Sequence, residues 1–430
     1  MSDLLHQLLS GTLADVDGGE PLSVPTRTVV IERSLEGLEA DLLRGLDLGG
    51  RLAVVCDPTT RDVLGRRVER AAASVAKVDP IILPDRPHAD AHLAEKIGKS
   101  AQSADALIAV GSGTINDLCK YAGAQAGKPY AVFATAPSMN GYTSVNAAIT
   151  QHGHKKSIQA QGAAGVFIDL EVFAAAPPRM IRSGLGDSLC RPTAQADWLL
   201  AHLLFDLPYR RAPFALLAED EALLFAEPEG LLTGDLDAMA RLARTLVLSG
   251  FGMTICGGSY PASQGEHLIA HYIEMMMDPA LPPSFHGEQI AVTTLTMARL
   301  QEQMLAAPAP VVRPSRLEAA EFERRYGPAT GRSCWREFAT KRLGDDKAAV
   351  LNDRLAETWK SIAGEIAEIS VPAAQLHDAV KRIGAPATPE DLGLPGAFYR
   401  DAVMHAREIR DRFTFLDLAA DSGLLASFTP

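Results

Sequence analysis

The chain has 430 residues, of which 47% are hydrophobic and 22% charged, and its formal net charge at pH 7 is −12. This length is enough to bury a large core and indicates two domains. The negative charge argues against nucleic-acid binding, although an acidic protein can still bind an anionic substrate in a local basic pocket.

The apolar runs and the cysteines narrow the class of protein further. No uninterrupted apolar run reaches the roughly 18 residues that span a bilayer, and the first residues lack the basic region and apolar stretch of a secretory signal. We therefore expect a cytoplasmic protein without membrane insertion. The five cysteines lie far apart and form no C-x-x-C pair, which argues against a disulfide framework and a thiolate zinc site.

Short aliphatic runs alternate with amphipathic helical stretches up to about residue 180. This alternation predicts a Rossmann-like α/β domain over residues 1–180, with a largely parallel sheet and helices on both faces. The predicted strands are 28–31, 52–56, 81–83, 107–110 and 130–133.

Long segments rich in Ala, Leu, Met, Glu and Arg follow, and they predict an all-helical domain over residues 181–430. A hinge is expected near Pro177, Pro178 and Arg179. The predicted helices are 189–206, 214–225, 233–248, 262–277, 287–305, 316–325, 347–368, 373–382 and 397–419.

Two loops predict an anion or cofactor site. The first follows strand 107–110 and opens a helix; its glycines let backbone amides approach a phosphate at the positive end of the helix dipole. An ordinary turn capped by Ser112 or Thr114 is the alternative. The second loop follows strand 130–133, where ligands of open α/β sheets bind. The candidate residues are Gly111, Ser112, Gly113, Thr114 and Ile115, then Thr135, Ala136, Pro137 and Ser138.

One carboxylate and two imidazoles form a candidate metal site. Asp187 ends a short segment with two glycines, and His267 and His286 each have a glycine and a glutamate beside them. Such a set can hold a divalent ion and leave a coordination position for a substrate oxygen, which is typical of a catalytic site. His271 lies four residues after His267 on the predicted helix 262–277, so both project from one face.

These motifs together resemble the sn-glycerol-1-phosphate dehydrogenase family, within the superfamily of iron-containing alcohol dehydrogenases, glycerol dehydrogenases and dehydroquinate synthases. The resemblance covers most of the chain and implies the two-domain, dehydroquinate synthase-like architecture. The sequences that carry it lie at 111–121, 135–144, 184–187, 265–271, 286–289 and 406–416.

The resemblance implies specific roles. Both loops, with Ser144, would bind NAD or NADP; Asp187, His267 and His286 would bind one divalent ion, zinc before nickel or iron; Asp187 and His271 would contact the substrate. The chain departs from the family at Asn140, where an aspartate normally binds substrate. Asparagine can form hydrogen bonds but cannot take up a proton, so the change bears on substrate identity.

Several other polar residues have two interpretations each. Asp57 ends strand 52–56 and could bind the adenosine ribose or form a turn before Pro58. Glu266 and Glu288 could orient the neighbouring metal ligands or cap helix starts. Lys155 and Lys156 are candidates for the substrate phosphate or for a solvated surface.

The expected reaction is reduction of dihydroxyacetone phosphate to sn-glycerol 1-phosphate, with His271 as proton donor and the protein as a homo-oligomer. The alternatives are a dehydrogenase of another polyol or phosphorylated ketone and a dehydroquinate synthase-like lyase or cyclase. Asn140 alone favours a non-catalytic binding protein, which retention of all three presumed metal ligands opposes.

Overall fold

The computed structural model describes residues 3–151 and 154–430. These residues form two compact units that are discontinuous in the chain. The first contains residues 3–151, 155–188 and 211–259, and the second contains residues 154, 189–210 and 260–430. The domain boundary expected near residue 180 stays a prediction.

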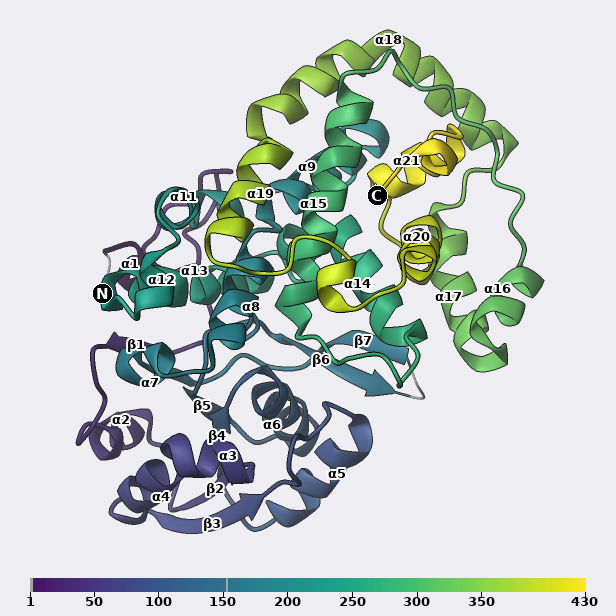
Figure 1. Ribbon diagram of the computed structural model, residues 1–430. Helices are drawn as coiled ribbons and strands as arrows, with labels where there is room; N and C mark the ends of the chain where they lie inside the picture. Colours follow the sequence, from purple (N-terminus) through teal and green to yellow (C-terminus); the bar gives the residue numbers. More distant parts are fainter. Residues whose placement is uncertain (1–2, 152–153) are drawn as a thin grey trace. The chain divides into compact units, whose positions relative to one another are not determined.

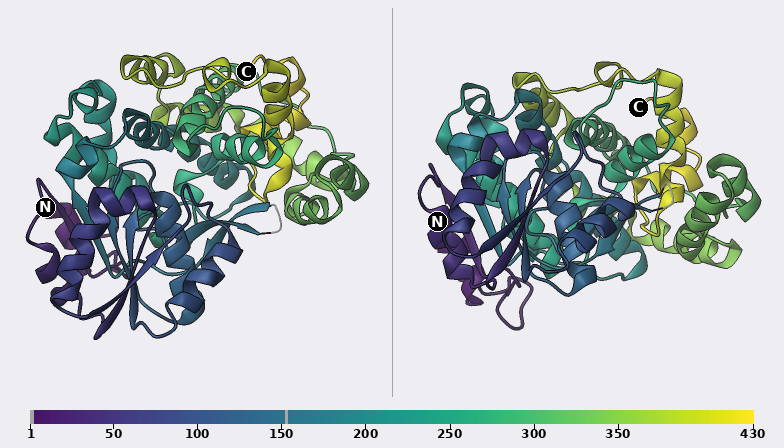
Figure 2. Two further views of the ribbon diagram at one scale, coloured as in Figure 1. Left: turned by 60° about the horizontal axis from the view of Figure 1, so that its bottom comes forward. Right: turned by 90° about the horizontal axis from the view of Figure 1, so that it is seen from below.

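The first unit is built on a parallel sheet with order β1-β8-β5-β4-β2-β3. The further views show helices on both sides of the fan of strands (Figure 2). The strands are β1 Thr28–Glu32, β2 Arg51–Cys56, β3 Lys77–Ile82, β4 Ala106–Gly111, β5 Tyr130–Ala134 and β8 Gly165–Asp169, and β6 Asn146–Gln151 pairs separately with β7 His154–Gln159.

Some helices of the first unit alternate with the strands along the chain, and others come after the last strand (Figure 1). They are α1 Asp3–Ser10, α2 Glu39–Leu46, α3 Pro58–Thr60, η1 Arg61–Gly65, α4 Arg66–Ala73, α5 Ala91–Ser100, α6 Gly113–Ala126, α7 Leu170–Ala174, α8 Pro178–Ser188, α10 Ala212–Ala215, α11 Ala218–Ala226, α12 Gly230–Thr233 and α13 Leu236–Ile255.

The predicted parallel sheet is confirmed, with two differences in its strands. The third strand begins at Lys77, four residues before the predicted 81–83. β8 was not predicted; it inserts between β1 and β5. The sheet core explains the strand composition, because the inward side chains of β2, β4 and β5 alternate with period two and pack with α2 and α4.

The strand order places a topological switch between β2 and β4. The chain moves outward from β2 to β3 and then returns to β4 on the other side of β2. Ligands of such sheets bind beyond the carboxyl ends of the strands at this point. The register aligns Gly111 with Ala134, so β4 and β5 end level with each other and their loops start side by side.

The second unit is helical, as predicted for this half of the chain. Its helices are η2 Tyr260–Ala262, α9 Arg191–Phe205, α14 Gly265–Met276, α15 His286–Leu305, α16 Ala319–Tyr326, α17 Pro328–Lys341, α18 Asp345–Ile369, α19 Ala373–Arg382, η3 Glu390–Leu392, α20 Gly396–His405, η4 Ala406–Ile409, α21 Phe415–Asp421 and η5 Leu425–Ser427. No helix among the described residues is long and apolar enough to cross a membrane.

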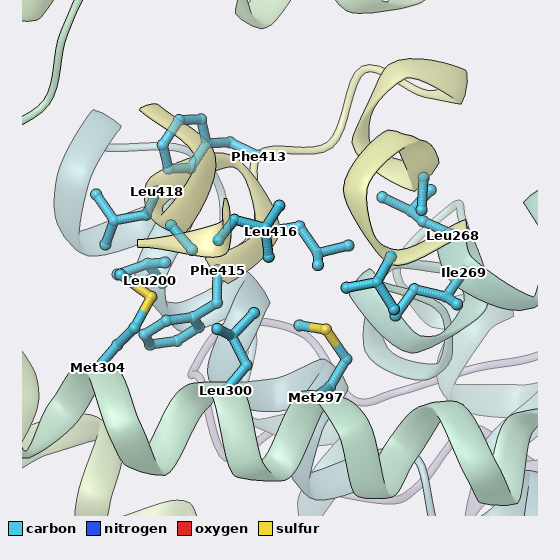
Figure 3. Close-up of a cluster of buried hydrophobic side chains, with 14 of the residues drawn as sticks. Leu200, Leu268, Ile269, Met297, Leu300, Met304, Phe413, Phe415, Leu416 and Leu418 are labelled. Carbon is cyan, nitrogen blue, oxygen red and sulfur yellow. The ribbon is translucent and has the colours of Figure 1, made fainter. Parts of the chain in front are cut away.

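The core of the second unit joins α15 to the segment around α21. Met297, Leu300 and Met304 project from one face of α15 toward Phe415 and Leu416 (Figure 3). This spacing of three and four residues is the apolar stripe of a packed helix. The contact anchors the chain immediately after residue 412.

The predicted helix 397–419 is wrong as a single element. The chain forms α20, the short η4 and then α21, with extended backbone at Arg410. Thr414 begins α21 as a capping box with Asp417, because its side chain accepts a hydrogen bond from Leu416 N. Asp417 Oδ2 in turn accepts a bond from Thr414 N at 2.9 Å. These caps stop a continuous helix although the apolar period continues through the segment.

Asp169, at the end of β8, joins three parts of the first unit. Its carboxylate accepts bonds from Leu35 N at 2.9 Å and from Arg67 Nη2 at 2.6 Å. It also caps α7 by accepting from the backbone of Glu171 and Val172. Since the side chain is only 1% exposed, these are buried, charge-assisted bonds.

We predict that Asp169→Ala lowers the free energy of unfolding by about 3–5 kcal/mol, because Arg67 loses a buried partner and the cap is lost. The midpoint of thermal unfolding checks this. Arg33→Ala is the control: it breaks an ion pair with Glu171 whose side chains are 79% and 50% exposed, and such a pair contributes at most about 1 kcal/mol. Equal shifts for the two variants would contradict the assignment.

Candidate functional site

The loop between β4 and α6 has the conformation of an anion-binding helix start. Ser112 is extended at φ −91° and ψ −161°, and its side chain forms no capping hydrogen bond. The turn capped by Ser112 therefore lacks its defining contact. Neighbouring side chains lie close to the backbone at both glycines of this loop. A Cβ added at Gly111 would lie 2.5 Å from Ile115 Cδ1, and one added at Gly113 would lie 2.8 Å from Met139 Cγ.

The loop after β5 lies directly beside it. Thr135 N donates to Gly111 O at 3.2 Å, which joins the two loops. Tyr142 Oη donates to Ala136 O at 2.7 Å, and Ser183 Oγ donates to Ser138 O at 3.1 Å. The structure thus brings together the two predicted cofactor loops, and it holds the second one from α8.

Helix α8 approaches this loop through a glycine. A Cβ on Gly184 would lie 1.6 Å from Pro137 O, a distance that no side chain can occupy. One turn later the same helix presents Asp187, whose Oδ2 accepts a hydrogen bond from Asn140 N at 2.9 Å. Asp187 is therefore bound to the backbone of residue 140, and this contact does not depend on the side chain there.

Ser144 is buried farther along the same loop. Its Oγ accepts a bond from Asn146 N at 3.0 Å. The neighbouring Thr143 donates to Val247 O of α13 at 2.6 Å, and Gly250 of α13 leaves room for the backbone at Asn140. Ser144 thus lies in a tightly held part of the loop, and its contact with the cofactor stays a prediction.

A buried lysine beneath the loop was missed by the sequence analysis. Lys120 Nζ on α6 donates to Gly141 O at 2.7 Å and to Asn146 O at 2.8 Å, and it lies 3.3 Å from Asp117 Oδ1. Asp117 also accepts from Ala148 N at 3.0 Å. Burial lowers the pKa of Lys120, against the opposing effect of the Asp117 carboxylate.

The available signal for this lysine was Asp117 three residues before Lys120 on an apolar helix. Such a pair is usually a surface ion pair, so spacing alone did not indicate burial. In the structure Lys120 is 0% exposed. Its ammonium therefore positions the loop that carries Asn140 and Ser144.

Three histidines gather in the second unit. His267 and His271 lie on α14, and His286 is the first residue of α15. Their ring centroids are 5.2 Å apart for His267 and His286 and 5.8 Å apart for each of the other two pairs. The predicted projection of His267 and His271 from one helix face is confirmed.

Carboxylates contact two of these imidazoles. Glu266 Oε1 lies 2.9 Å from His267 Nδ1 and also accepts from Gln264 N at 2.7 Å. Glu274 Oε1 lies 3.4 Å from His286 Nδ1. A carboxylate that is hydrogen-bonded to an imidazole, as Glu266 is to His267, fixes the ring orientation of such a histidine.

The donor chemistry fits a divalent ion. His271, Glu274 and His286 offer ligand atoms within 4.8 Å of one another, as do Cys190, Glu266 and His267. Imidazole and carboxylate together suit zinc, iron and nickel. Asp187 lies on α8 in the first unit, and its joining His267 and His286 around one ion stays a prediction.

The structure also bears on the other candidates. Asp57 Oδ1 caps α3 by accepting from Thr60 N at 2.7 Å, the contact expected of a turn-forming aspartate. Glu288 accepts from Phe285 N at 2.8 Å and so caps the start of α15. Lys155 and Lys156 lie on β7 and are half-buried.

Comparisons with known proteins agree with these features. Residues 30–177 match the family model described as iron-containing alcohol dehydrogenase. The fold is that of a butanol dehydrogenase from Thermotoga maritima, with a TM-score of 0.62 at 14% identity, covering 97% of this chain and 99% of that one. Glycerol dehydrogenase from Schizosaccharomyces pombe gives a TM-score of 0.61 at 14% identity, covering 97% and 92%. These matches define the class of fold as that of the iron-containing alcohol dehydrogenases.

Sequence relatives narrow the family. The chain is 31% identical to a glycerol-1-phosphate dehydrogenase [NAD(P)+] from Pyrococcus furiosus over 274 residues, 64% of this chain and 78% of that protein. It is 27% identical to the Bacillus licheniformis enzyme of the same name over 381 residues, 87% of this chain and 84% of that one. The chain belongs to the glycerol-1-phosphate dehydrogenase family.

We predict that Gly184→Ala weakens NADH binding by at least about tenfold, because the new methyl group must displace the backbone at Pro137 or the helix α8. Titration of NADH fluorescence measures this. Gly45→Ala on α2 is the control, since its Cβ meets nothing within 4 Å. That change should be neutral or stabilising by up to about 1 kcal/mol. Unchanged NADH affinity in Gly184→Ala would show that the loop does not bind the cofactor.

A second prediction concerns Lys120. We expect Lys120→Met to lower the melting temperature and to weaken NADH binding several-fold, because two carbonyls and Asp117 lose their buried partner. Lys128→Met is the matched control. Lys128 also binds backbone carbonyls of the first unit, at 2.7 Å from those of Ala101 and Gln102, but it precedes the amino end of β5, whereas the loop follows the carboxyl end of this strand. The Lys128→Met variant should lose stability and keep its affinity for NADH. An equal loss of NADH affinity in Lys128→Met and Lys120→Met would contradict a positioning role for Lys120.

Proposed function

We propose that this chain is a metal-dependent, NAD(P)-linked oxidoreductase that reduces dihydroxyacetone phosphate to sn-glycerol 1-phosphate. The observation that carries the proposal is family membership, through relatives that are named as glycerol-1-phosphate dehydrogenases. Two features of the structure support it. They are the paired glycine and Thr135–Ser138 loops at the carboxyl ends of β4 and β5, and the cluster of three histidines on α14 and α15.

In this proposal the chain's own residues bind both ligands. Gly111 to Ile115 receive the pyrophosphate at the start of α6, and the loop 135–138 with Ser144 lies against the nicotinamide half. Asp187, His267 and His286 would hold the ion, zinc by our proposal. When bound, the ion supplies electrophilic polarisation of the ketone, and the nicotinamide supplies the hydride.

His271 is the residue that we assign to proton transfer. Hydride addition to C2 leaves negative charge on the carbonyl oxygen, and a positioned imidazole with ordered water or the sugar hydroxyls can provide the proton. Asn140 orients a substrate hydroxyl by hydrogen bonding only, since its amide cannot exchange a proton. We further propose a cytoplasmic homo-oligomer.

The test is whether the protein oxidises NADH or NADPH when dihydroxyacetone phosphate is added. The fall in absorbance of the reduced cofactor measures this oxidation. Metal-dependent turnover that yields the sn-1 isomer supports the proposal. Absence of turnover in protein that binds NADH and metal would overturn the substrate assignment. It would favour a different phosphorylated ketone or aldehyde, as Asn140 allows, and a panel of these compounds would follow.

Metal removal gives a further prediction. Chelation should abolish activity and added zinc should restore it, because the carbonyl is no longer polarised in the stripped protein.

His267→Ala should lower the metal content per chain. It should also reduce activity by more than the roughly 10- to 100-fold that is typical of losing a group hydrogen-bonded to a metal ligand. Elemental analysis measures the metal. His377→Ala, on the exposed face of α19, is the control. Full metal content in His267→Ala would remove this residue from the ligand set.

A further inference from the structure

Arg410 lies beside His271 in the second unit, and the charge of Arg412 acts on Arg410 from two residues further along the chain. Arg410 Nη2 is 3.3 Å from Nδ1 of His271, although 139 positions separate the two residues. A guanidinium group has no acceptor, so Arg410 donates and the His271 nitrogen accepts. In the neutral ring the proton is therefore on Nε2.

Positive charge is concentrated at this point. Arg412 donates to Ser263 O, and its guanidinium lies 4.6 Å from the centre of the Tyr260 ring. Burial and then the neighbouring Arg410 charge lower the pKa of Arg412 to about 10. Burial likewise lowers the pKa of Arg410, although Glu337 and Asp411 oppose this effect. Two guanidinium groups are thus held near each other at a cost in solvation and repulsion.

Among the described residues, no carboxylate forms an ion pair with Arg410. The hydrogen bond of its guanidinium group goes to His271. Two nearby arginines of this unit have such a partner. Arg407, three residues earlier, lies 2.7 Å from Asp421 Oδ1, and Arg325 pairs with Glu408. Arg410 therefore differs from the structural arginines around it, and an anionic ligand would supply the missing charge.

The segment that carries both arginines lies between a short helix and a packed, capped one. Arg410 is extended at φ −148° and ψ 165°, between η4 and the capped start of α21. Phe413, Phe415 and Leu416 fix the following residues in the core with Leu300 of α15 (Figure 3). A preorganised guanidinium loses little conformational freedom when it binds an anion.

We propose that Arg410, supported by Arg412, binds the phosphate group of the substrate and so makes the site selective for phosphorylated ketones. The inference rests on the proposed function and names the residue that recognises its substrate class. The phosphate oxygens accept two parallel bonds from the guanidinium fork, and the reacting carbonyl reaches the neighbouring His271. Lys155 and Lys156, the anion candidates of the sequence analysis, are then dispensable.

The experiment compares dihydroxyacetone phosphate with unphosphorylated dihydroxyacetone in the metal-loaded enzyme. Arg410→Gln should raise KM for the phosphorylated ketone by about 10- to 100-fold and lower the ratio of kcat/KM between the two substrates by a similar factor. Arg410→Lys keeps the charge without the fork and should fall between this variant and the wild type. Arg400→Gln, an exposed arginine on α20, is the charge-matched control and should keep the ratio.

A binding measurement separates recognition from catalysis. Inorganic phosphate, titrated calorimetrically into the loaded enzyme, should bind the wild type and Arg400→Gln but bind Arg410→Gln at least about tenfold more weakly. Melting curves confirm that each variant is folded; if Arg410→Gln does not fold, the Arg410→Lys comparison decides. An unchanged ratio and unchanged phosphate affinity in a folded Arg410 variant would overturn the inference.

Two further outcomes identify what has failed. Loss of the preference in Lys155→Gln/Lys156→Gln, with Arg410→Gln unaffected, would place the phosphate at β7 and overturn the role of Arg410. Failure of the wild type to reduce dihydroxyacetone phosphate would reject the proposed function. Phosphate binding that still depends on Arg410 would then leave an anion site for a different phosphorylated ligand.

Discussion

The contact between α8 and the loop after β5 is the constraint on which the cofactor region depends. Gly184 lets the helix backbone reach Pro137 O, and the same helix then presents Asp187 to the amide of Asn140. A presumed metal ligand and a presumed cofactor loop are thus parts of one packed arrangement. Any side chain at residue 184 would move both, since interiors are close-packed and transmit such strain.

Buried charge stabilises the rest of that loop. Lys120 binds the carbonyls of Gly141 and Asn146 from below, and Asp117 compensates its charge. A buried ammonium is costly unless its protons are satisfied, and here three acceptors surround it. The hydrogen bonds of Lys120 hold the backbone of the segment that carries Asn140 and Ser144. The departure from the family at residue 140 therefore changes the side chain while the backbone amide stays bound to Asp187.

In the second unit, charged side chains of both signs lie beside the three histidines. Glu266 orients His267 and Glu274 lies 3.4 Å from His286, whereas a guanidinium donates to His271. In the proposed site His267 and His286 would hold the cation, and His271 would lie beside the anionic group of the substrate. A phosphorylated ketone carries a carbonyl oxygen and a phosphate a few bonds apart, and the proposed site would offer a cation to the first and a guanidinium group to the second. The division of roles among three adjacent histidines agrees with a small phosphorylated ketone as substrate.

The amino-acid sequence by itself determined the features that depend on near neighbours. These include the alternation of buried strands and helices, the glycines at the start of α6, and the four-residue spacing of His267 and His271, because each follows from local backbone geometry. Local pattern failed where long-range contacts prevailed. β8 is a five-residue strand that gains its partners only between β1 and β5, and the apolar period through 397–419 hides the break imposed by the Thr414 cap.

Only the tertiary structure decided which charged residues became internal. Nothing in the sequence near Lys120 indicates that carbonyls 21 and 26 positions later surround it, and nothing near Arg410 indicates a histidine 139 positions earlier. The cost of burying a charge is set by partners that the whole fold brings together. Such residues therefore look like ordinary surface cations until the chain is folded.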